Sequence, residues 1–243
     1  MSLPRPSQSM DDVRAFFDDF ARRNVDQHGP LERQLAYRVG LLAAHASFRP
    51  DDVVLDLGCG DGNHLRALAG RIGRGIGIDV APGMIESARR ATDAEHLDFR
   101  TDDARHLETV APDAVDVVIS VGALEHMIEP GAMLRSVARV LRPGGRFVCL
   151  TLHGDYLWYR TVAPALRYAT RHLATDRRLT APEAQALLQD AGFGSSTVDY
   201  WSFVPRGDMP PILAALFDGL DALGRWLHLP ILRGGLLLSA HLP

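Results

Sequence analysis

The fold of this chain is decided by the stretch Val53-Val54-Leu55-Asp56-Leu57-Gly58-Cys59-Gly60-Asp61-Gly62. It predicts a buried strand over 53–57 that ends in an acidic, glycine-rich turn and leads into a helix. Glycines in such a turn let backbone N–H groups approach a ligand closely, because glycine has no Cβ and tolerates positive φ. A pyrophosphate site would avoid the carboxylate of Asp56, whereas a cationic ligand would be attracted to it. The turn therefore favours a nucleoside that carries a positively charged amino-acid tail.

Short apolar runs and helical patterns alternate on both sides of this stretch. The predicted strands cover residues 53–57, 75–78, 97–100, 115–120, 146–151, 196–200 and 236–241. The predicted helices cover residues 31–46, 63–70, 82–91, 132–141, 181–191 and 212–227, after a first helix that Asp11 caps and that runs through Phe20. Strands that alternate with helices imply a parallel sheet with helices on both faces. We therefore predict an α/β fold with a doubly wound, mostly parallel seven-stranded sheet.

Composition narrows the class of protein. The chain has 243 residues, is 47% hydrophobic and 23% charged, and carries a formal net charge of −4. These values suit one soluble α/β domain and give no electrostatic footprint for nucleic acid. The N-terminus has no apolar signal core, charges interrupt the longest apolar stretches, and Cys59 and Cys149 lack metal-ligand spacing. We expect a cytoplasmic protein with free thiols, no metal, no nucleic-acid partner and no stable membrane insertion.

Two other nucleotide-binding patterns fit the turn poorly. A dinucleotide fingerprint needs glycines at 58, 60 and 63, but Asn63 occupies the last position and the third glycine is Gly62. A phosphate loop needs Gly-Lys followed by Ser or Thr, which the stretch lacks. An acid before the turn and a second acid, Asp79, at the end of the next predicted strand set this pattern apart from both.

An ordered set of motifs resembles the class I S-adenosylmethionine-dependent methyltransferases of the small-molecule type. The motifs are Asp56 to Gly62, Gly77-Ile78-Asp79-Val80, Asp102-Asp103-Ala104, Leu124-Glu125-His126, Leu141-Arg142-Pro143-Gly144-Gly145 and Leu187 to Phe193. Each motif alone is modest, but their order over roughly residues 50–200 is specific. The resemblance implies a Rossmann-like fold, S-adenosyl-L-methionine as cofactor and S-adenosyl-L-homocysteine as product.

The chain is expected to form a single methyltransferase domain over residues 1–243. Residues 1–46 would form an N-terminal helical cap, and residues 47–155 the cofactor-binding core. Residues 156–243 would contain a helical insertion after the fifth strand, on the substrate side, and the C-terminal part of the sheet. The apolar helix over 212–227 is expected to pack on the sheet, with a homodimer interface or a lid as alternatives.

The resemblance also assigns cofactor contacts. Asp79 would bind the ribose hydroxyls, Asp103 would accept from the adenine amine, and Asp56 would attract the ammonium group. Asp102 leaves the register of the adenine contact open, since either acid could cap a turn instead. The predicted cofactor-binding residues are Asp56, Gly58, Cys59, Gly60, Asp79, Val80, Met84, Asp103, Ala104 and Ser120.

Candidates for the general base and for the acceptor site lie near the predicted carboxyl edge of the sheet. His126 follows the fourth strand and His153 follows the fifth, with Tyr156 and His28 as further candidates for the base. The acceptor would contact Phe20, Tyr156 and Tyr159, although aromatic side chains are more often core residues. Glu125 is expected to fix its loop rather than to act as an acid.

The leading functional hypothesis is methyl transfer to a small, apolar or aromatic metabolite, in secondary metabolism or quinone-like chemistry. Oxygen is favoured over nitrogen or carbon as the acceptor atom. Enzymes that methylate amide or base nitrogens carry an Asn/Asp-Pro-Pro-aromatic segment, where this chain has Ser120-Val121-Gly122-Ala123-Leu124. The alternatives are a different reaction in the same cofactor pocket, as in cyclases or decarboxylases, and a non-catalytic regulatory partner.

Overall fold

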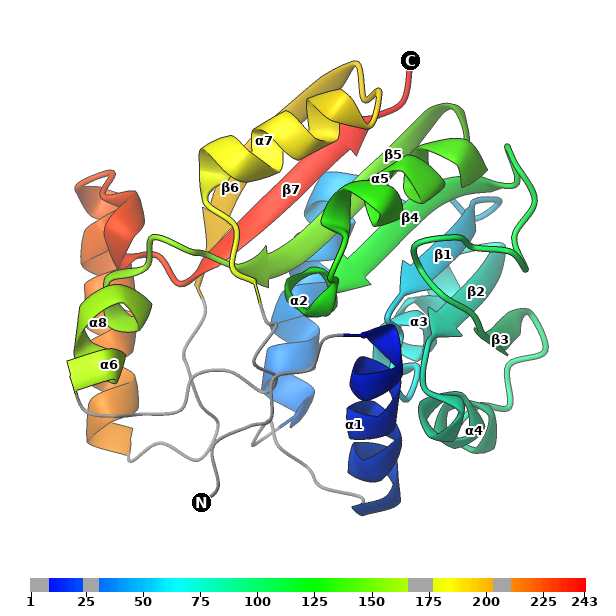
Figure 1. Cartoon of the computed structure of the whole chain (residues 1–243), viewed down its shortest axis with the longest axis horizontal. Helices are drawn as coiled ribbons and strands as arrows, with labels where there is room; N and C mark the ends of the chain where they lie inside the picture. Colours follow the sequence, from blue (N-terminus) through cyan, green and yellow to red (C-terminus); the bar gives the residue numbers. More distant parts are fainter. Residues whose placement is uncertain (1–8, 24–30, 166–176, 203–210) are drawn as a thin grey trace.

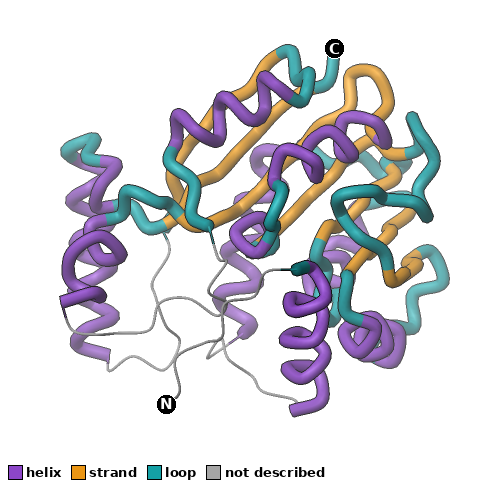
Figure 2. Tube along the Cα trace, in the orientation of Figure 1, coloured by secondary structure: helices purple, strands orange, loops and turns teal. Residues whose placement is uncertain are grey.

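The computed structural model describes residues 9–23, 31–165, 177–202 and 211–243 (Figures 1 and 2). Its seven-stranded sheet has the order β3-β2-β1-β4-β5-β7-β6. The strands are β1 (Val53–Leu57), β2 (Arg74–Asp79), β3 (Leu97–Thr101), β4 (Val115–Val121), β5 (Leu141–Leu152), β6 (Ser195–Trp201) and β7 (Gly235–His241). The doubly wound, mostly parallel sheet predicted from the sequence is confirmed.

Helices flank the sheet on both faces. They are α1 (Met10–Arg23), α2 (Leu31–Ala46), α3 (Asn63–Leu68), α4 (Pro82–Arg90), α5 (Pro130–Val140), α6 (Ala163–Ala165), α7 (Ala181–Asp190) and α8 (Pro211–Trp226). Short helical turns are η1 (Ala69–Arg71), η2 (Leu124–His126), η3 (Trp158–Val162) and η4 (Pro230–Leu232). In Figure 1, α5 and α7 cover the near face of the sheet, and α2 lies behind it.

The strand pairing brings the carboxyl ends of the parallel strands to one edge of the sheet. Strand β1 pairs in parallel with β2 and β4, and β4 pairs in parallel with β5. Strand β7 is antiparallel to both of its neighbours, β5 and β6, so β6 joins the sheet only through β7. In α/β sheets of this kind, ligands bind outside the carboxyl ends of the strands.

Side chains of the central strands alternate between two hydrophobic cores. On β1, Val54 packs into the core that α2, α3 and α4 complete, whereas Leu55 and Leu57 face α5 and α7. This alternation follows from the period of two in a strand. Because both faces are covered, β4 is apolar almost throughout, as expected for a parallel strand buried on two sides.

One helix cap was predicted correctly and another was not. Thr180 and Glu183 form the predicted capping box at the start of α7. At α1, however, Asp11 is not the cap. The Asp12 N–H donates to the Ser9 hydroxyl at 3.4 Å, and the Ser9 N–H donates back to the Asp12 carboxylate at 3.3 Å. A reciprocal pair three residues apart satisfies two backbone donors, which Asp11 in the first turn cannot do.

The strand β5 begins earlier than predicted. Leu141 is already extended, with φ −70° and ψ 138°, and pairs with Val115 of β4. The register between β4 and β5 then shifts before Arg146. Pro143 disfavours helical geometry at the residue before it, so the helix ends at Val140, ahead of the Pro-Gly-Gly segment. The predicted boundaries at residues 141 and 146 were therefore wrong.

Helix α8 does not bury the leucine stripe that its sequence pattern predicts. Its apolar residues Ile212, Leu216 and Trp226 are exposed, whereas Asp221 is buried. The Asp221 carboxylate accepts from Arg233 Nε at 2.8 Å and pairs with the Ser202 hydroxyl. The expectation that the leucine stripe packs on the sheet was wrong, because the helix is anchored through Phe217 and through the ionic network of Asp221. Within the described ranges, no helix is long and apolar enough to cross a membrane.

Candidate functional site

The glycine-rich turn after β1 is built to bring a ligand against the backbone. The N–H groups of Gly58 and Cys59 both donate to the carbonyl of Ile78, at 2.8 and 3.0 Å, which fastens the turn to the end of β2. Gly60 has φ +53°, and a Cβ built there would meet no atom within 4 Å among the described residues. A side chain is therefore absent where the turn opens, and a ligand can approach the backbone.

Asp56 supplies an unpaired buried carboxylate beneath this turn. It is 1% exposed, and neither of its oxygens has a hydrogen-bond partner in the described part of the chain. Burial, together with the carboxylates of Asp79 and Asp61, raises the pKa of Asp56 to about 8. A carboxylate in such a place is costly unless a cation pairs with it. The site therefore fits a ligand that carries an ammonium group.

Asp79 ends β2 beside the turn. One oxygen accepts from the Gly60 N–H at 3.0 Å and the other from the Ala81 N–H at 2.9 Å. Burial raises the pKa of Asp79, although these backbone hydrogen bonds oppose the change. Each carboxylate oxygen keeps a further lone pair, so the pair of oxygens can accept from two neighbouring hydroxyls. This arrangement fits the ribose of the expected cofactor.

The two acids after β3 are both engaged in their loop. Asp102 accepts from the N–H and the hydroxyl of Thr109, each at 2.7 Å. Asp103 accepts from the Arg105 guanidinium at 2.7 Å and from the Arg105 N–H at 2.9 Å. Partial burial disfavours the charge of Asp103, but the hydrogen bonds from Arg105 hold its pKa below the usual value. Asp102 thus caps the turn. Asp103 is held in place by Arg105, and its neighbour Ala104 is buried.

Helix α1 covers the loop that leads from β2 into α4. The Gly83 N–H donates to the Asp18 carboxylate at 2.8 Å, and Arg14 Nε donates to the Val80 carbonyl at 3.2 Å. Figure 1 shows α1 standing beside α4. Through these contacts α1 brings Phe16 and Phe17 against the same apolar cluster as Val80, one of the predicted cofactor residues. Met84, another, is buried in α4.

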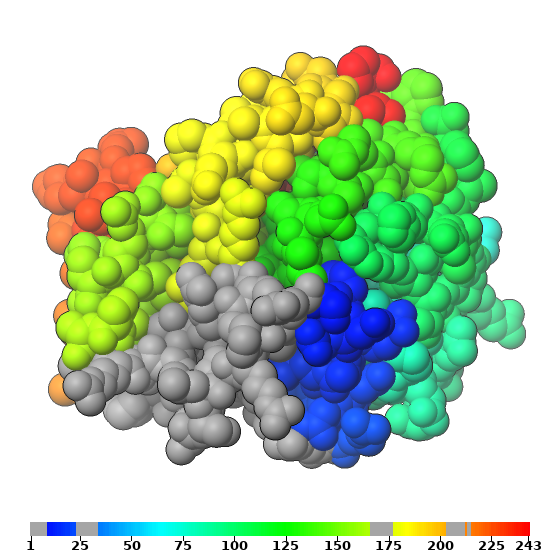
Figure 3. Space-filling model, in the orientation of Figure 1, coloured from blue at the N-terminus to red at the C-terminus, as the bar shows by residue number. Residues whose placement is uncertain are grey.

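The same helix reaches the end of β4. The ring of Phe17 lies edge-on to His126, with ring centroids 5.2 Å apart, and Phe20 lies 6.4 Å from Phe17. In Figure 3 the blue surface of α1 adjoins the green surface of the segment that follows β4. The structure thus brings Phe20 and His126 to one aromatic wall. Ser120 lies below it, where its hydroxyl donates to the Leu57 carbonyl at 3.1 Å and ties β4 to β1.

The remaining predicted residues form a separate group near α8. His153 is buried, its Nδ1 lies 2.9 Å from the Arg233 carbonyl, and burial lowers its pKa. Tyr156 and Tyr159 are also buried, with ring centroids 5.4 Å apart, and pack in one cluster with Phe217 of α8. In the described part of the chain, no hydrogen bond or ring contact joins these three side chains to Asp56 or Asp79. His28 and residues 166–176 lie outside the described residues.

Three further residues meet at the carboxyl end of β5. Glu125 accepts from the Thr151 hydroxyl at 2.8 Å. Trp201 Nε1 donates to the Thr151 carbonyl at 3.2 Å, and the Arg38 guanidinium lies 5.9 Å from the centroid of the Trp201 ring. Sequence reasoning did not find this contact of Arg38 with Trp201, because a single arginine in an amphipathic helix carries no signal of it.

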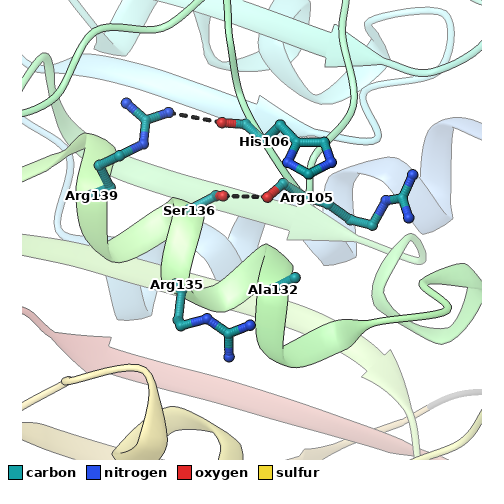
Figure 4. A pocket seen from close by; sticks show the side chains of 6 residues that line it. All are labelled: Arg105, His106, Ala132, Arg135, Ser136 and Arg139. Carbon is teal, nitrogen blue, oxygen red and sulfur yellow. Dashed lines mark hydrogen bonds between the residues drawn. The ribbon is translucent and has the colours of Figure 1, made fainter.

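A basic hollow lies between α5 and the loop that carries Arg105 and His106 (Figure 4). It encloses about 330 Å³ and is lined by Arg105, His106, Ala132, Arg135, Ser136 and Arg139. Figure 4 shows the three guanidinium groups pointing in different directions. Arg105 is held by Asp103, and Arg139 donates to backbone carbonyls, including that of His106 at 2.9 Å. The guanidinium groups that line the hollow therefore do not converge on one point where they could bind a single ligand.

Comparison with known proteins agrees with this geometry. A family model described as a methyltransferase domain matches residues 55–149. An uncharacterized 37.1 kDa protein in transposon TN4556 of Streptomyces fradiae is 33% identical over 184 residues, which are 72% of this chain and 52% of that protein. A ubiquinone biosynthesis O-methyltransferase of Xanthomonas campestris pv. campestris is 33% identical over 163 residues, 65% of this chain and 67% of that enzyme.

A solved structure extends the match to nearly the whole fold. It is the complex between the Haloferax volcanii Trm112 methyltransferase activator and its methyltransferase, with a TM-score of 0.71 and 28% identity. The match covers 93% of this chain and 97% of that chain. In contrast, this chain spans about half the length of the Streptomyces relative and about two thirds of the Xanthomonas relative.

Proposed function

Because this chain belongs to the class I S-adenosylmethionine-dependent methyltransferases, we propose that it methylates a small, apolar or aromatic metabolite, on oxygen in preference to nitrogen or carbon. The observation that carries the proposal is the buried, unpaired carboxylate of Asp56 beside Asp79. The Xanthomonas relative, named as an O-methyltransferase of ubiquinone biosynthesis, supports oxygen as the acceptor atom. A role in secondary metabolism and a cytoplasmic location belong to the same proposal.

The cofactor would be held by residues of the first three strand ends. We assign its ammonium group to Asp56, its ribose to Asp79, and its adenine to Val80, Met84, Asp103 and Ala104. The backbone of Gly58, Cys59 and Gly60 would lie against it, and Ser120 would support the turn from below. When bound, the cofactor supplies a methyl group already activated on a sulfonium. Alignment of the acceptor can then contribute roughly 7–11 kcal/mol to lowering the barrier.

The acceptor would enter from the side of α1 and of the segment after β5. We assign Phe20, Tyr156 and Tyr159 to the apolar wall that would meet the acceptor, and His126 and His153 are the histidine candidates for proton transfer. The division into a helical cap (1–46), a cofactor-binding core (47–155) and a substrate-side part (156–243) follows from this assignment. The exposed apolar residues of α8 support the pairing of two copies, which sedimentation at increasing concentration would measure.

The test of the cofactor site is calorimetry with S-adenosylhomocysteine. Asp79→Ala removes both acceptors for the ribose hydroxyls, so affinity should fall about 10-fold or more. Asp98→Ala is the matched control, because Asp98 is an exposed carboxylate of the neighbouring strand β3 and should leave affinity unchanged. Equal affinity for the wild type and Asp79→Ala would contradict the ribose assignment. The mass of the product separates methyl transfer, which adds one methylene unit, from cyclase or decarboxylase chemistry in the same pocket.

A further inference from the structure

Two groups of opposite charge face the carboxyl end of β5 without forming an ion pair. Glu125 is 5% exposed, and Arg38 is half-buried. No salt bridge or hydrogen bond engages the Arg38 guanidinium in the described part of the chain, although burial lowers its pKa and the charge of Glu125 opposes that change. Removing two charges from water without a direct pair is costly. A third group that bonds to both would offset the cost.

Their neighbours hold both side chains toward the same strand end. The Thr151 hydroxyl bonds to one oxygen of Glu125 at 2.8 Å. The other oxygen, Oε1, lies above Gly122, 3.9 Å from where a Cβ would be. Trp201, under the Arg38 guanidinium, is fixed by its hydrogen bond to the Thr151 carbonyl. Thr151 therefore connects the supports of both charged groups.

The chemistry of this pair selects a neutral hydroxyl. A carboxylate ligand would be repelled by Glu125, and an ammonium ligand by Arg38. A hydroxyl can donate its hydrogen to the carboxylate and accept a hydrogen bond from the guanidinium at the same time. When the hydroxyl loses its proton, the negative charge on its oxygen is stabilised by Arg38.

We propose that Glu125 and Arg38 bind the hydroxyl of the methyl acceptor, with Glu125 as the general base and Arg38 as the group that stabilises the resulting oxyanion. This inference rests on the proposed function. The acceptor oxygen passes its proton to Oε1 of Glu125 and forms a bond to the methyl carbon. The carbon–sulfur bond of the cofactor breaks, and its electron pair stays on sulfur to give S-adenosylhomocysteine. The proton on Glu125 then returns to water.

This assignment differs from the one that the sequence pattern favoured for Glu125. Glu125 does help to fix its loop, but it does so through its backbone, because its carbonyl accepts from the Arg177 N–H at 2.8 Å. Yet the Thr151 bond uses only one of its two oxygens, which leaves Oε1 for the acceptor. His153, in contrast, directs its Nδ1 at the Arg233 carbonyl. Glu125 is therefore better placed to accept the proton than His153, the histidine candidate at the end of β5.

The experiment uses 4-nitrophenol as a probe, because its visible absorbance reports whether the bound hydroxyl is ionised. The full chain saturated with S-adenosylhomocysteine is titrated with the probe, for the wild type, Glu125→Gln and Arg38→Met. Arg38→Met should weaken binding of the phenolate roughly 10- to 100-fold. Glu125→Gln should favour the bound phenolate, because it removes the repelling charge and keeps the Thr151 contact. Exposed residues give the matched controls, Glu95→Gln and Arg135→Met.

Turnover provides the second measurement, with phenols of graded acidity as acceptors. Glu125→Gln should lower kcat about 10²- to 10⁴-fold for weakly acidic phenols, and the loss should shrink for phenols already ionised at the assay pH. If Glu125→Gln and Arg38→Met bind the probe with the affinity of the wild type, the Glu125–Arg38 assignment is overturned. It is overturned equally if neither the wild type nor the variants bind the probe. Failure of the wild type to bind S-adenosylhomocysteine would instead overturn the proposed function itself.

Discussion

Replacing Asp56 with asparagine should remove a steep pH dependence from the stability of the ligand-free protein. Burial, then the carboxylates of Asp79 and Asp61, raise the pKa of Asp56 from 3.8 to about 8. The folded state therefore binds this proton more tightly than the unfolded state. The free energy of unfolding is highest below the unfolded pKa and falls as the pH rises toward the folded pKa. The slope is about 1.4 kcal/mol per pH unit, so the wild type should lose about 3 kcal/mol between about pH 5 and about pH 7.5.

Urea denaturation across that pH range measures this loss. Asp56→Asn has no proton to lose there, so the part of the slope that belongs to Asp56 should disappear. Asp93→Asn, which changes an exposed loop carboxyl, should keep the wild-type slope. Saturating S-adenosylhomocysteine should reduce the loss in the wild type, because its ammonium group stabilises the charged carboxylate. Parallel curves for the wild type and Asp56→Asn would refute the burial of an unpaired carboxyl at this position.

Two further substitutions test the turn and the anchor of α8. Gly58→Ala should lower the free energy of unfolding in urea by about 1–3 kcal/mol, because φ is +68° and the new Cβ would lie 2.3 Å from that of Ala123. The Cβ of Gly60→Ala meets no such neighbour. This variant should therefore lose less stability than Gly58→Ala, but more affinity for S-adenosylhomocysteine. Asp221→Asn should cost about 3–5 kcal/mol by thermal or urea unfolding, because Arg233 loses its buried counter-charge. Asp218→Asn, on the exposed side of the same helix, should unfold like the wild type.

Much of the sheet could be predicted from the sequence, because strands that are buried on both faces consist of nearly continuous apolar runs. The apolar run of β4 and the acidic ends of β1 and β2 are local features, and they led to Asp56 and Asp79. Helix boundaries were less certain, since the cap at Ser9 depends on how the backbone turns before α1. The orientation of α8 could not be read from periodicity. A stripe of leucines shows that one face is apolar, but the buried contact of Asp221 with Arg233 decides which face meets the protein.

The residues that we propose for the acceptor could be predicted less completely from the sequence than those that we propose for the cofactor. The proposed cofactor residues follow the ends of consecutive strands, so they can be predicted from their order along the chain. Arg38, Glu125 and Trp201 come from a helix, a turn and an edge strand that are far apart in the sequence. These residues come together around Thr151 only in the folded chain, so no local sequence pattern predicts the contact.

The position of β7 has a consequence for the order in which the molecule is made. Strand β6 leaves the ribosome before β7, yet β6 touches the sheet only through β7. Until residues 235–241 emerge, β6 has no partner strand and β5 keeps an open edge. The parallel strands can pair during synthesis, whereas the last two strands must dock together afterwards. A nascent chain stalled before residue 235 would expose an apolar strand edge, the kind of surface that chaperones bind and that aggregates recruit.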